Sequence, residues 1–152
     1  TSMAAANYDI QVDQGSTFVF NVSYLDTSES VIDLTEHVAS MQVRKSIFTD
    51  KILISVTGNT LGGSVLGGGS TGHFLSGTGS NTIGTGGIFL NASTGGVTGS
   101  GSNTGGIHIT IDATTMKNVP RGIHFYDLEL TKDTEVTRIL EGRFEVGSEI
   151  TR

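Results

Sequence analysis

Apolar and polar side chains alternate along short segments of the chain, which is typical of strands with one buried face. In the segment 16–25, Phe18 and Phe20 would point to one side while Thr17 and Asn21 point to the other. The predicted strands are 16–25, 38–45, 51–57, 106–112, 123–131 and 136–146. The side chains expected to face the core are Phe18, Phe20, Val22 and Tyr24; Ala39, Met41 and Val43; Ile107, Ile109 and Ile111; Tyr126, Leu128 and Leu130; and Leu140, Phe144 and Val146.

One segment, 112–120, has a helical pattern. Asp112 can cap its amino end, Ala113 and Met116 can face inward, and Pro120 stops it. Seven or so short strands separated by polar turns predict an all-β fold. We expect a single-domain, antiparallel, Ig-like β-sandwich over residues 1–152, with one short helix.

Glycine is distributed unevenly along the chain. Eighteen of the 22 glycines lie between Gly58 and Gly106, and the stretch 52–111 contains no Asp, Glu, Lys or Arg. The chain therefore divides into a charged first arm (1–57), a neutral insertion rich in Gly, Ser, Thr and Asn (58–106) and a charged second arm (107–152).

The insertion allows two interpretations. Its composition is that of a flexible linker. It also contains an imperfect repeat, because Gly86–Leu90 recurs as Gly105–Ile109 and Gly79–Thr82 recurs as Gly101–Thr104. Such a repeat favours a turn-and-strand unit used twice, with neighbouring strands needed to hold it.

Small apolar clusters in the insertion are candidates for contact with a neighbouring subunit. Glycine lets two backbones approach closely, and unpaired N–H and C=O groups can pair with a strand of another subunit. An uncharged loop on the outer surface is the alternative. The candidate interface residues are Phe74, Leu75, Ile88, Phe89 and Leu90.

Charge and composition exclude several classes of function. A net charge of -6 repels a phosphate backbone, so we expect no nucleic-acid partner. No apolar run approaches the about 18 residues that span a bilayer, and no signal-peptide pattern is present, so we expect no membrane partner. Without cysteine there is no disulfide and no thiolate metal site.

The histidines give little support for catalysis. His37, His73, His108 and His124 are scattered, and no nucleophile motif or phosphate-binding loop accompanies them. A metal shared by His108 and His124 is possible if their strands are neighbours. Two strand histidines that face solvent are the simpler interpretation.

Two pairs of carboxylates, Asp127 with Glu129 and Glu141 with Glu145, are spaced to share a strand face. Acid–base catalysis would require them in a cleft with shifted pKa values. A solvated sheet face, with Arg138 and Arg143 as cross-strand partners, is the favoured alternative. We therefore expect a protein that is not an enzyme, with no catalytic residues, no metal and no cofactor.

The two arms resemble a family of small bacteriophage virion proteins. The matching blocks are YDIQVDQGSTFVFNVSY (Tyr8–Tyr24), VIDLTEHVASMQVRKS (Val31–Ser46), GGIHITIDATTMKNVPRG (Gly105–Gly122), YDLEL (Tyr126–Leu130) and VTRILEGRFEVGSEITR (Val136–Arg152). They are similar to β-sandwich modules of phage tail, baseplate and fibre-attachment proteins, especially those of tailed cyanophages. The family pattern has a short linker where this chain has its insertion.

This resemblance implies a structural role without catalysis. We expect a virion subunit, foremost of the tail or baseplate, that assembles through the sandwich and the insertion with other virion proteins and with copies of itself. It would lie in the host cytoplasm during assembly. A capsid decoration or cement protein on the head is the alternative, and a glycan-binding receptor module ranks lower because the insertion has no Trp or Tyr.

Overall fold

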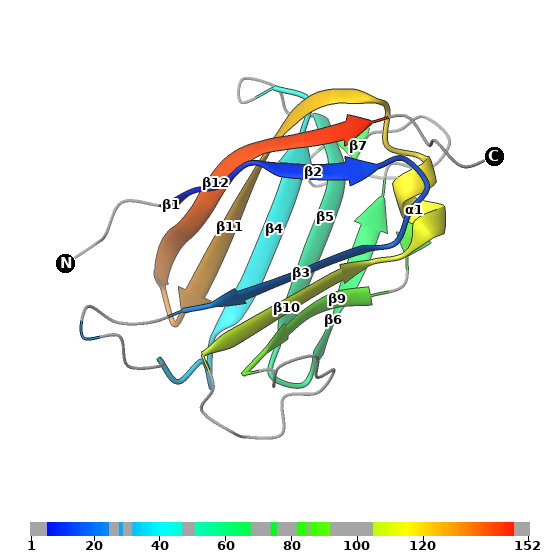
Figure 1. Cartoon of the computed structure of the whole chain (residues 1–152). Helices are drawn as coiled ribbons and strands as arrows, with labels where there is room; N and C mark the ends of the chain where they lie inside the picture. Colours follow the sequence, from blue (N-terminus) through cyan, green and yellow to red (C-terminus); the bar gives the residue numbers. More distant parts are fainter. Residues whose placement is uncertain are drawn as a thin grey trace.

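The chain folds into one curled β-sheet. The computed structural model describes residues 6–24, 28, 32–46, 51–67, 74–75, 82–84, 86–91 and 105–147. These residues are mostly β-strand with one small helix, and their strands join a single hydrogen-bonded sheet that curls into a half-barrel (Figure 1). The expected all-β class is therefore confirmed.

The described ranges hold twelve strands and one helix. The strands are β1 (Ala6–Asn7), β2 (Ile10–Asp13), β3 (Phe18–Ser23), β4 (Val38–Arg44), β5 (Lys51–Asn59), β6 (Gly62–Gly67), β7 (Phe74–Leu75), β8 (Thr82–Gly84), β9 (Gly86–Leu90), β10 (Gly106–Ile111), β11 (Gly122–Lys132) and β12 (Glu135–Gly147), and the helix is α1 (Ala113–Lys117). Within those ranges, no helix is long and apolar enough to cross a membrane.

The sheet has the strand order β1-β12-β11-β4-β5-β9-β10-β3, with β2 also beside β12. Most pairs are antiparallel, as expected. The expectation is wrong for three pairs, because β1 and β2 run parallel to β12 and β9 runs parallel to β5. Nearly the whole chain separates β2 from β12, so no hairpin forces these two strands to run in opposite directions.

The curl places strands that are distant in this order around one hydrophobic core (Figure 1). The ring of Phe18 in β3 lies 5.4 Å from that of Phe144 in β12, centroid to centroid, and Phe144 lies 6.4 Å from Tyr126 in β11. Both ends of the strand order thus contribute to the same buried cluster. Such burial is the main stabilising contribution to a fold of this kind.

The predicted core positions of the two arms are confirmed. Every side chain predicted to face inward from 38–45, 123–131 and 136–146 is buried, as are Phe18 and the three isoleucines of β10. Phe20, Val22 and Tyr24 pack partly buried against the same cluster. Alternation alone decides these positions because each strand has one face on the core.

Two local predictions are corrected by the structure. His108 alternates with the isoleucines of β10 but is only 7% exposed, because its Nδ1 lies 2.5 Å from Asn21 Oδ1 on the neighbouring β3. Asp112 occupies the N-cap position of α1 without a capping hydrogen bond from its side chain. Its carboxylate instead accepts a bond from the hydroxyl of Thr115, while Met116 is buried as expected.

The described part of the insertion belongs to the sheet. Strands β6 to β9 lie within residues 58–106, and the side chains of Val65, Ile88 and Leu90 are fully buried. The repeated pentapeptides pair with each other, since β9 and β10 are antiparallel with Phe89 opposite His108. The other repeated unit lies almost wholly outside the described residues. In the described part of the insertion, the structure confirms the turn-and-strand interpretation rather than the flexible linker.

Glycines allow three strands to meet at one point. β5 pairs with β6 through Ile54–Thr57 and then with β9 at Gly58 and Asn59. A Cβ atom on Gly58 would overlap the carbonyl oxygen of Ile88, and one on Gly63 would overlap that of Thr57. The abundance of glycine here therefore reflects close backbone packing.

A buried asparagine ties the end of β9 to the loop before β4. Asn91, which is 1% exposed, accepts a hydrogen bond from the backbone N–H of Leu34 at 3.1 Å. Its Nδ2 donates to Asp33 Oδ1 at 3.2 Å and to Thr35 Oγ1 at 3.3 Å. Asn91 takes a left-handed conformation (φ 57°) that asparagine tolerates better than most residues. The contact fixes the point at which the chain leaves β9.

Candidate functional site

The outer face of β4, β11 and β12 carries a group of charged side chains with two ion pairs. We call this surface the outer charged face and define it by Gln42, Arg44, Asp127, Glu129, Arg138 and Glu141, which line a shallow groove of about 380 Å³ together with Phe125 and Tyr126. The inward side chains of these strands are buried, so alternation directs the charged ones to solvent.

A β-bulge is what places Arg138 on this face. Leu128 pairs with Leu140, but the next residue, Glu129, pairs with Arg138, so Ile139 is an extra residue in β12. Strict alternation from Leu140 would turn Arg138 toward the core. The bulge reverses its direction, as bulges commonly do beside functional surfaces.

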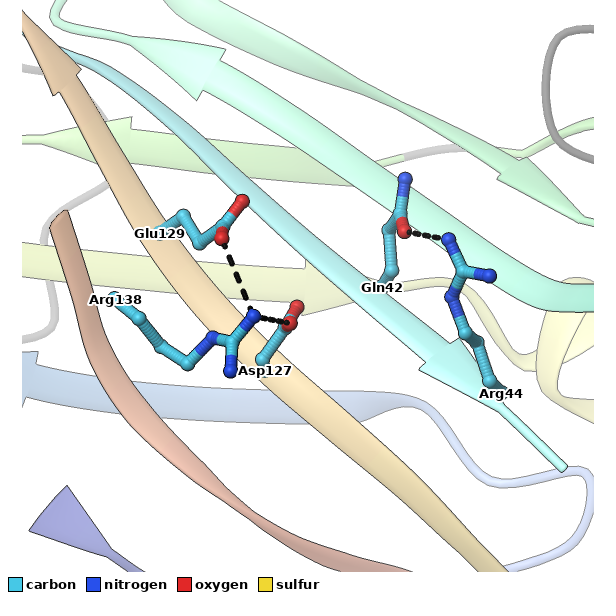
Figure 2. A network of polar contacts seen from close by, with 5 residues as sticks. All are labelled: Gln42, Arg44, Asp127, Glu129 and Arg138. Carbon is cyan, nitrogen blue, oxygen red and sulfur yellow. Dashed lines mark hydrogen bonds and ion pairs between the residues drawn. The ribbon is translucent and has the colours of Figure 1, made fainter. Parts of the chain in front are cut away.

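Arg138 lies between two carboxylates of β11. Its Nη2 is 3.3 Å from Asp127 Oδ2 and 3.6 Å from Glu129 Oε2 (Figure 2). On the adjacent β4, Arg44 Nη2 donates to Gln42 Oε1 at 2.7 Å. Figure 2 shows the two groups side by side, from three neighbouring strands. The side chain of Arg138 remains 50% exposed, so its guanidinium has donors left for a further partner.

The surroundings of Asp127 disfavour the ionised form of its carboxyl group. Burial raises the pKa of Asp127 above its usual value, and the neighbouring charge of Glu129 raises it further, whereas Arg138 and Arg44 lower it. The raising effects prevail. A carboxylate kept partly out of water beside other charges is common where proteins bind something, although structural ion pairs produce it too.

Exposed apolar side chains flank the charges at both ends of the outer charged face. Val38 of β4 and Val136 of β12 both pair with Thr131, so they lie in one row across the strands, 48% and 57% exposed. Toward the other end, Ile123 is 50% exposed. Partly desolvated charges with apolar neighbours and a central arginine are typical of protein–protein interfaces.

The groove meets one condition for acid–base chemistry, because Asp127 and Glu129 line it and the pKa of Asp127 is raised, but Arg138 pairs with both carboxylates. Its lining residues include no histidine and no hydroxyl nucleophile other than the buried Tyr126, whose hydroxyl donates to the backbone carbonyl of Tyr8 at 2.6 Å. Across the described part of the chain, no group of three or more His, Asp or Glu side chains is placed to hold a metal ion. The chemistry that this face offers is ion pairing and hydrogen bonding to a partner.

The structure separates the candidate interface residues of the insertion. Ile88 and Leu90 are fully buried in the chain's own core, and Phe89 is partly exposed on the opposite face of β9. Phe74 and Leu75 form β7, whose backbone pairs with Lys51 and Ile52, and their side chains lie outside the described residues. Of the three described side chains, Phe89 alone reaches the surface.

The expected histidine pair does not form, whereas the carboxylates Asp127 and Glu129 share a partner. β10 and β11 are not hydrogen-bonded neighbours, so the expected neighbouring of His108 and His124 is wrong. The solvent-facing interpretation is wrong as well, because both side chains are buried; His124 Nε2 is 2.6 Å from the carbonyl oxygen of Pro120. His73 falls outside the described residues. The cross-strand role expected for Arg138 with Asp127 and Glu129 is confirmed.

Glu141 and Glu145 both point outward from β12, where they contribute to different surfaces. Glu141 lies on the outer charged face, opposite Asp127, whereas Glu145 lines a second groove beside β2 and β3. The backbone N–H of Arg143 donates to Asp9 Oδ1 at 3.0 Å. The sequence carried no signal for this second groove, because it depends on how the sheet curls.

No protein-family model matches the chain, and no curated protein matches it.

Proposed function

We propose that the protein is a structural subunit of a bacteriophage virion, foremost of the tail or baseplate. The sequence blocks that resemble phage modules supply β2, β3, β4, β10, β11 and β12. Most residues of the buried core belong to these strands, which lie on both sides of the curl. A β frame whose described strands are joined in one hydrogen-bonded sheet suits permanent assembly, in which the same contacts persist for the life of the particle.

The finer architecture that we propose is a sandwich-type module derived from the curl. One layer comprises β4, β5, β11 and β12, and the other comprises β3, β9 and β10. Contacts such as Phe18 with Phe144 join side chains across the core, in the manner of facing sheets. Of the glycine-rich strands, β9 belongs to the frame between β5 and β10, and β6 to β8 lie off the main strand order.

The observation that carries the proposal is the outer charged face. Arg138, Asp127 and Glu129 form a partly exposed ion-pair network at the surface, and surface pairs of this kind contribute little to the stability of a fold. Their arrangement beside Val38 and Val136 is better suited to recognition of a neighbouring virion protein.

Incorporation into particles tests the proposal. A phage that lacks the gene would be complemented with the wild type, with Arg138→Glu, or with Lys117→Glu, which makes the same charge change on the exposed side of α1. We expect Arg138→Glu to lower the copies per purified particle by about tenfold or more, as loss of an interface arginine does. Lys117→Glu should incorporate normally.

Three results would count against the proposal. Absence of the wild-type protein from purified particles would refute the virion role. Equal incorporation of both variants would refute the role of the outer charged face. Immunogold labelling confined to the capsid would replace the tail or baseplate by the head, which is the decoration or cement alternative.

A further inference from the structure

Among the described residues, no backbone hydrogen bond joins β2 to β3, so the two ends of the curled sheet face each other across an unclosed seam. β2 pairs with β12 on one side only and β3 pairs with β10 on one side only, while both line one groove of about 630 Å³. We call it the seam groove; its lining includes Tyr8, Asp9, Asp13, Val19, Phe20 and Glu145. Aromatic side chains cross the seam, with the rings of Tyr8 and Phe20 5.5 Å apart.

No described strand pairs with the edge of β3 that faces this groove. The N–H of Tyr24 donates to the carbonyl of Gly105 at 2.8 Å, and β3 pairs with β10 in regular antiparallel register. Successive residues of a strand direct their backbone groups to opposite sides. Val19 and Asn21, at odd positions relative to Tyr24, therefore direct their N–H and C=O groups into the seam.

This edge lacks the usual protection against pairing. Native edge strands are commonly blunted by proline, lysine, a bulge or short length. β3 is six residues long, reads FVFNVS, and shows no register shift against β10. Val19 is 54% exposed beside the unpaired edge. Such a strand is a template for a further strand.

The charges around the seam groove indicate which strand it takes. Asp9, Asp13 and Glu145 are among the lining residues, and the described lining contains no lysine or arginine. A second copy of this chain, pairing β3 with β3, would bring two acidic rims together. A segment with positive charge would instead be attracted, and its apolar side chains would cover Val19 and the exposed ring of Tyr8.

We propose that the seam groove binds an extended, cationic segment of another protein, which adds as a strand to the free edge of β3 and continues the sheet toward β2. Backbone hydrogen bonds to Val19 and Asn21 supply affinity, and alternating side chains supply selectivity. The acidic rim selects lysine or arginine on the outward face of the added strand. This inference is independent of the virion role, because it rests on the seam alone.

Peptides of defined sequence test the inference with the full chain. The probe is the capped peptide Thr-Val-Lys-Val-Lys-Val-Thr, compared with its Glu-for-Lys counterpart and with a copy N-methylated on one edge. Hydrogen exchange and amide chemical shifts are followed by NMR. In the free protein the amides of Val19 and Asn21 should exchange much faster than that of Phe20, which points toward β10. Binding of the lysine peptide should slow hydrogen exchange at the amides of Val19 and Asn21. The two control peptides should bind at least about tenfold more weakly.

Variants of the protein supply matched controls. Val19→Pro removes the edge N–H and should weaken binding of the lysine peptide at least about tenfold. Val19→Thr keeps the N–H, so this variant should bind the lysine peptide as the wild type does. If Val19→Pro fails to fold, the double variant Asp13→Asn with Glu145→Gln tests the rim instead, and it should reduce the preference for lysine over glutamate. The inference is overturned by equal binding of the lysine and glutamate peptides, by binding that leaves Val19 and Asn21 unprotected, or by no binding at millimolar peptide.

Discussion

Phe18 and Phe144 meet edge to face with their ring centroids 5.4 Å apart, although their strands lie far apart in the hydrogen-bonded order of the sheet. The contact therefore depends on the curl and joins the first arm of the chain to the second. Phe18 also stacks on Phe20 at 6.1 Å, so the contact is part of an aromatic row along the seam.

Truncating either ring should destabilise the protein strongly. Phe144 is fully buried and Phe18 is 5% exposed, so Phe18→Ala and Phe144→Ala should each lower the free energy of unfolding by about 3–5 kcal/mol. A double-mutant cycle should give a coupling of about 0.5–1.5 kcal/mol. Chemical denaturation followed by circular dichroism measures both, and Val19→Ala serves as an exposed neighbour with little effect. Strict additivity of the two truncations would mean that the curl does not bring the rings together.

Asn91 should be sensitive to substitution through both its side chain and its backbone. Asn91→Ala leaves the buried N–H of Leu34 without a partner and places alanine in a left-handed conformation, which together cost about 2–4 kcal/mol. Asn91→Gly removes the backbone strain but not the unpaired N–H. The stability order in thermal unfolding should therefore be wild type, then glycine, then alanine. An alanine variant as stable as the wild type would show that this link is unimportant.

Glycine at the three-strand crossing should be irreplaceable. Gly58→Ala places a Cβ against the carbonyl oxygen of Ile88, and because backbone cannot move aside cheaply, the loss should be about 3 kcal/mol or more. Gly147→Ala is the matched control, since the nearest atom to its added Cβ, the carbonyl oxygen of Val12, lies at 3.8 Å. Equal unfolding midpoints in denaturant for the two variants would show that the backbones of Gly58 and Ile88 do not approach this closely.

Asp127 should give stability a specific dependence on pH. Because its pKa is raised in the folded state, the folded protein binds this proton more tightly than the unfolded chain. Its contribution to the free energy of unfolding therefore increases as pH falls through the folded pKa, and is constant below the unfolded value of about 3.9. The stability of the wild type relative to Asp127→Asn should rise as the solution is acidified from neutral pH. Glu135→Gln, at an exposed hairpin position, controls for general titration. A relative stability that falls on acidification would contradict the assignment.

The fold of the arms could be predicted from sequence because each of their strands has one buried face, so apolar and polar residues alternate along it. Ala39, Met41 and Val43 follow that rule, and their burial needs no knowledge of the neighbouring strands. The strands of the insertion were harder to predict because glycine has no side chain to alternate. Only the similarity of Gly86–Leu90 to Gly105–Ile109 indicated that both form strands, and their pairing with each other is seen in the structure alone.

The candidate site was predictable only in part. Sequence spacing placed Asp127 and Glu129 on one face and suggested Arg138 as their partner, but the bulge at Ile139 that brings it there has no clear sequence signal. The seam groove could not be foreseen at all. It arises because the sheet curls until β2 and β3 face each other, and that curl is a property of the whole sheet.

A cryo-EM map of the intact phage particle tests the central claim most directly. The account predicts density for this chain at a fixed position in the tail or baseplate, with a neighbouring protein in contact with Arg138, Val38 and Val136 on the outer charged face. A particle in which this chain is absent, or in which that face is exposed to solvent in every copy, would contradict it.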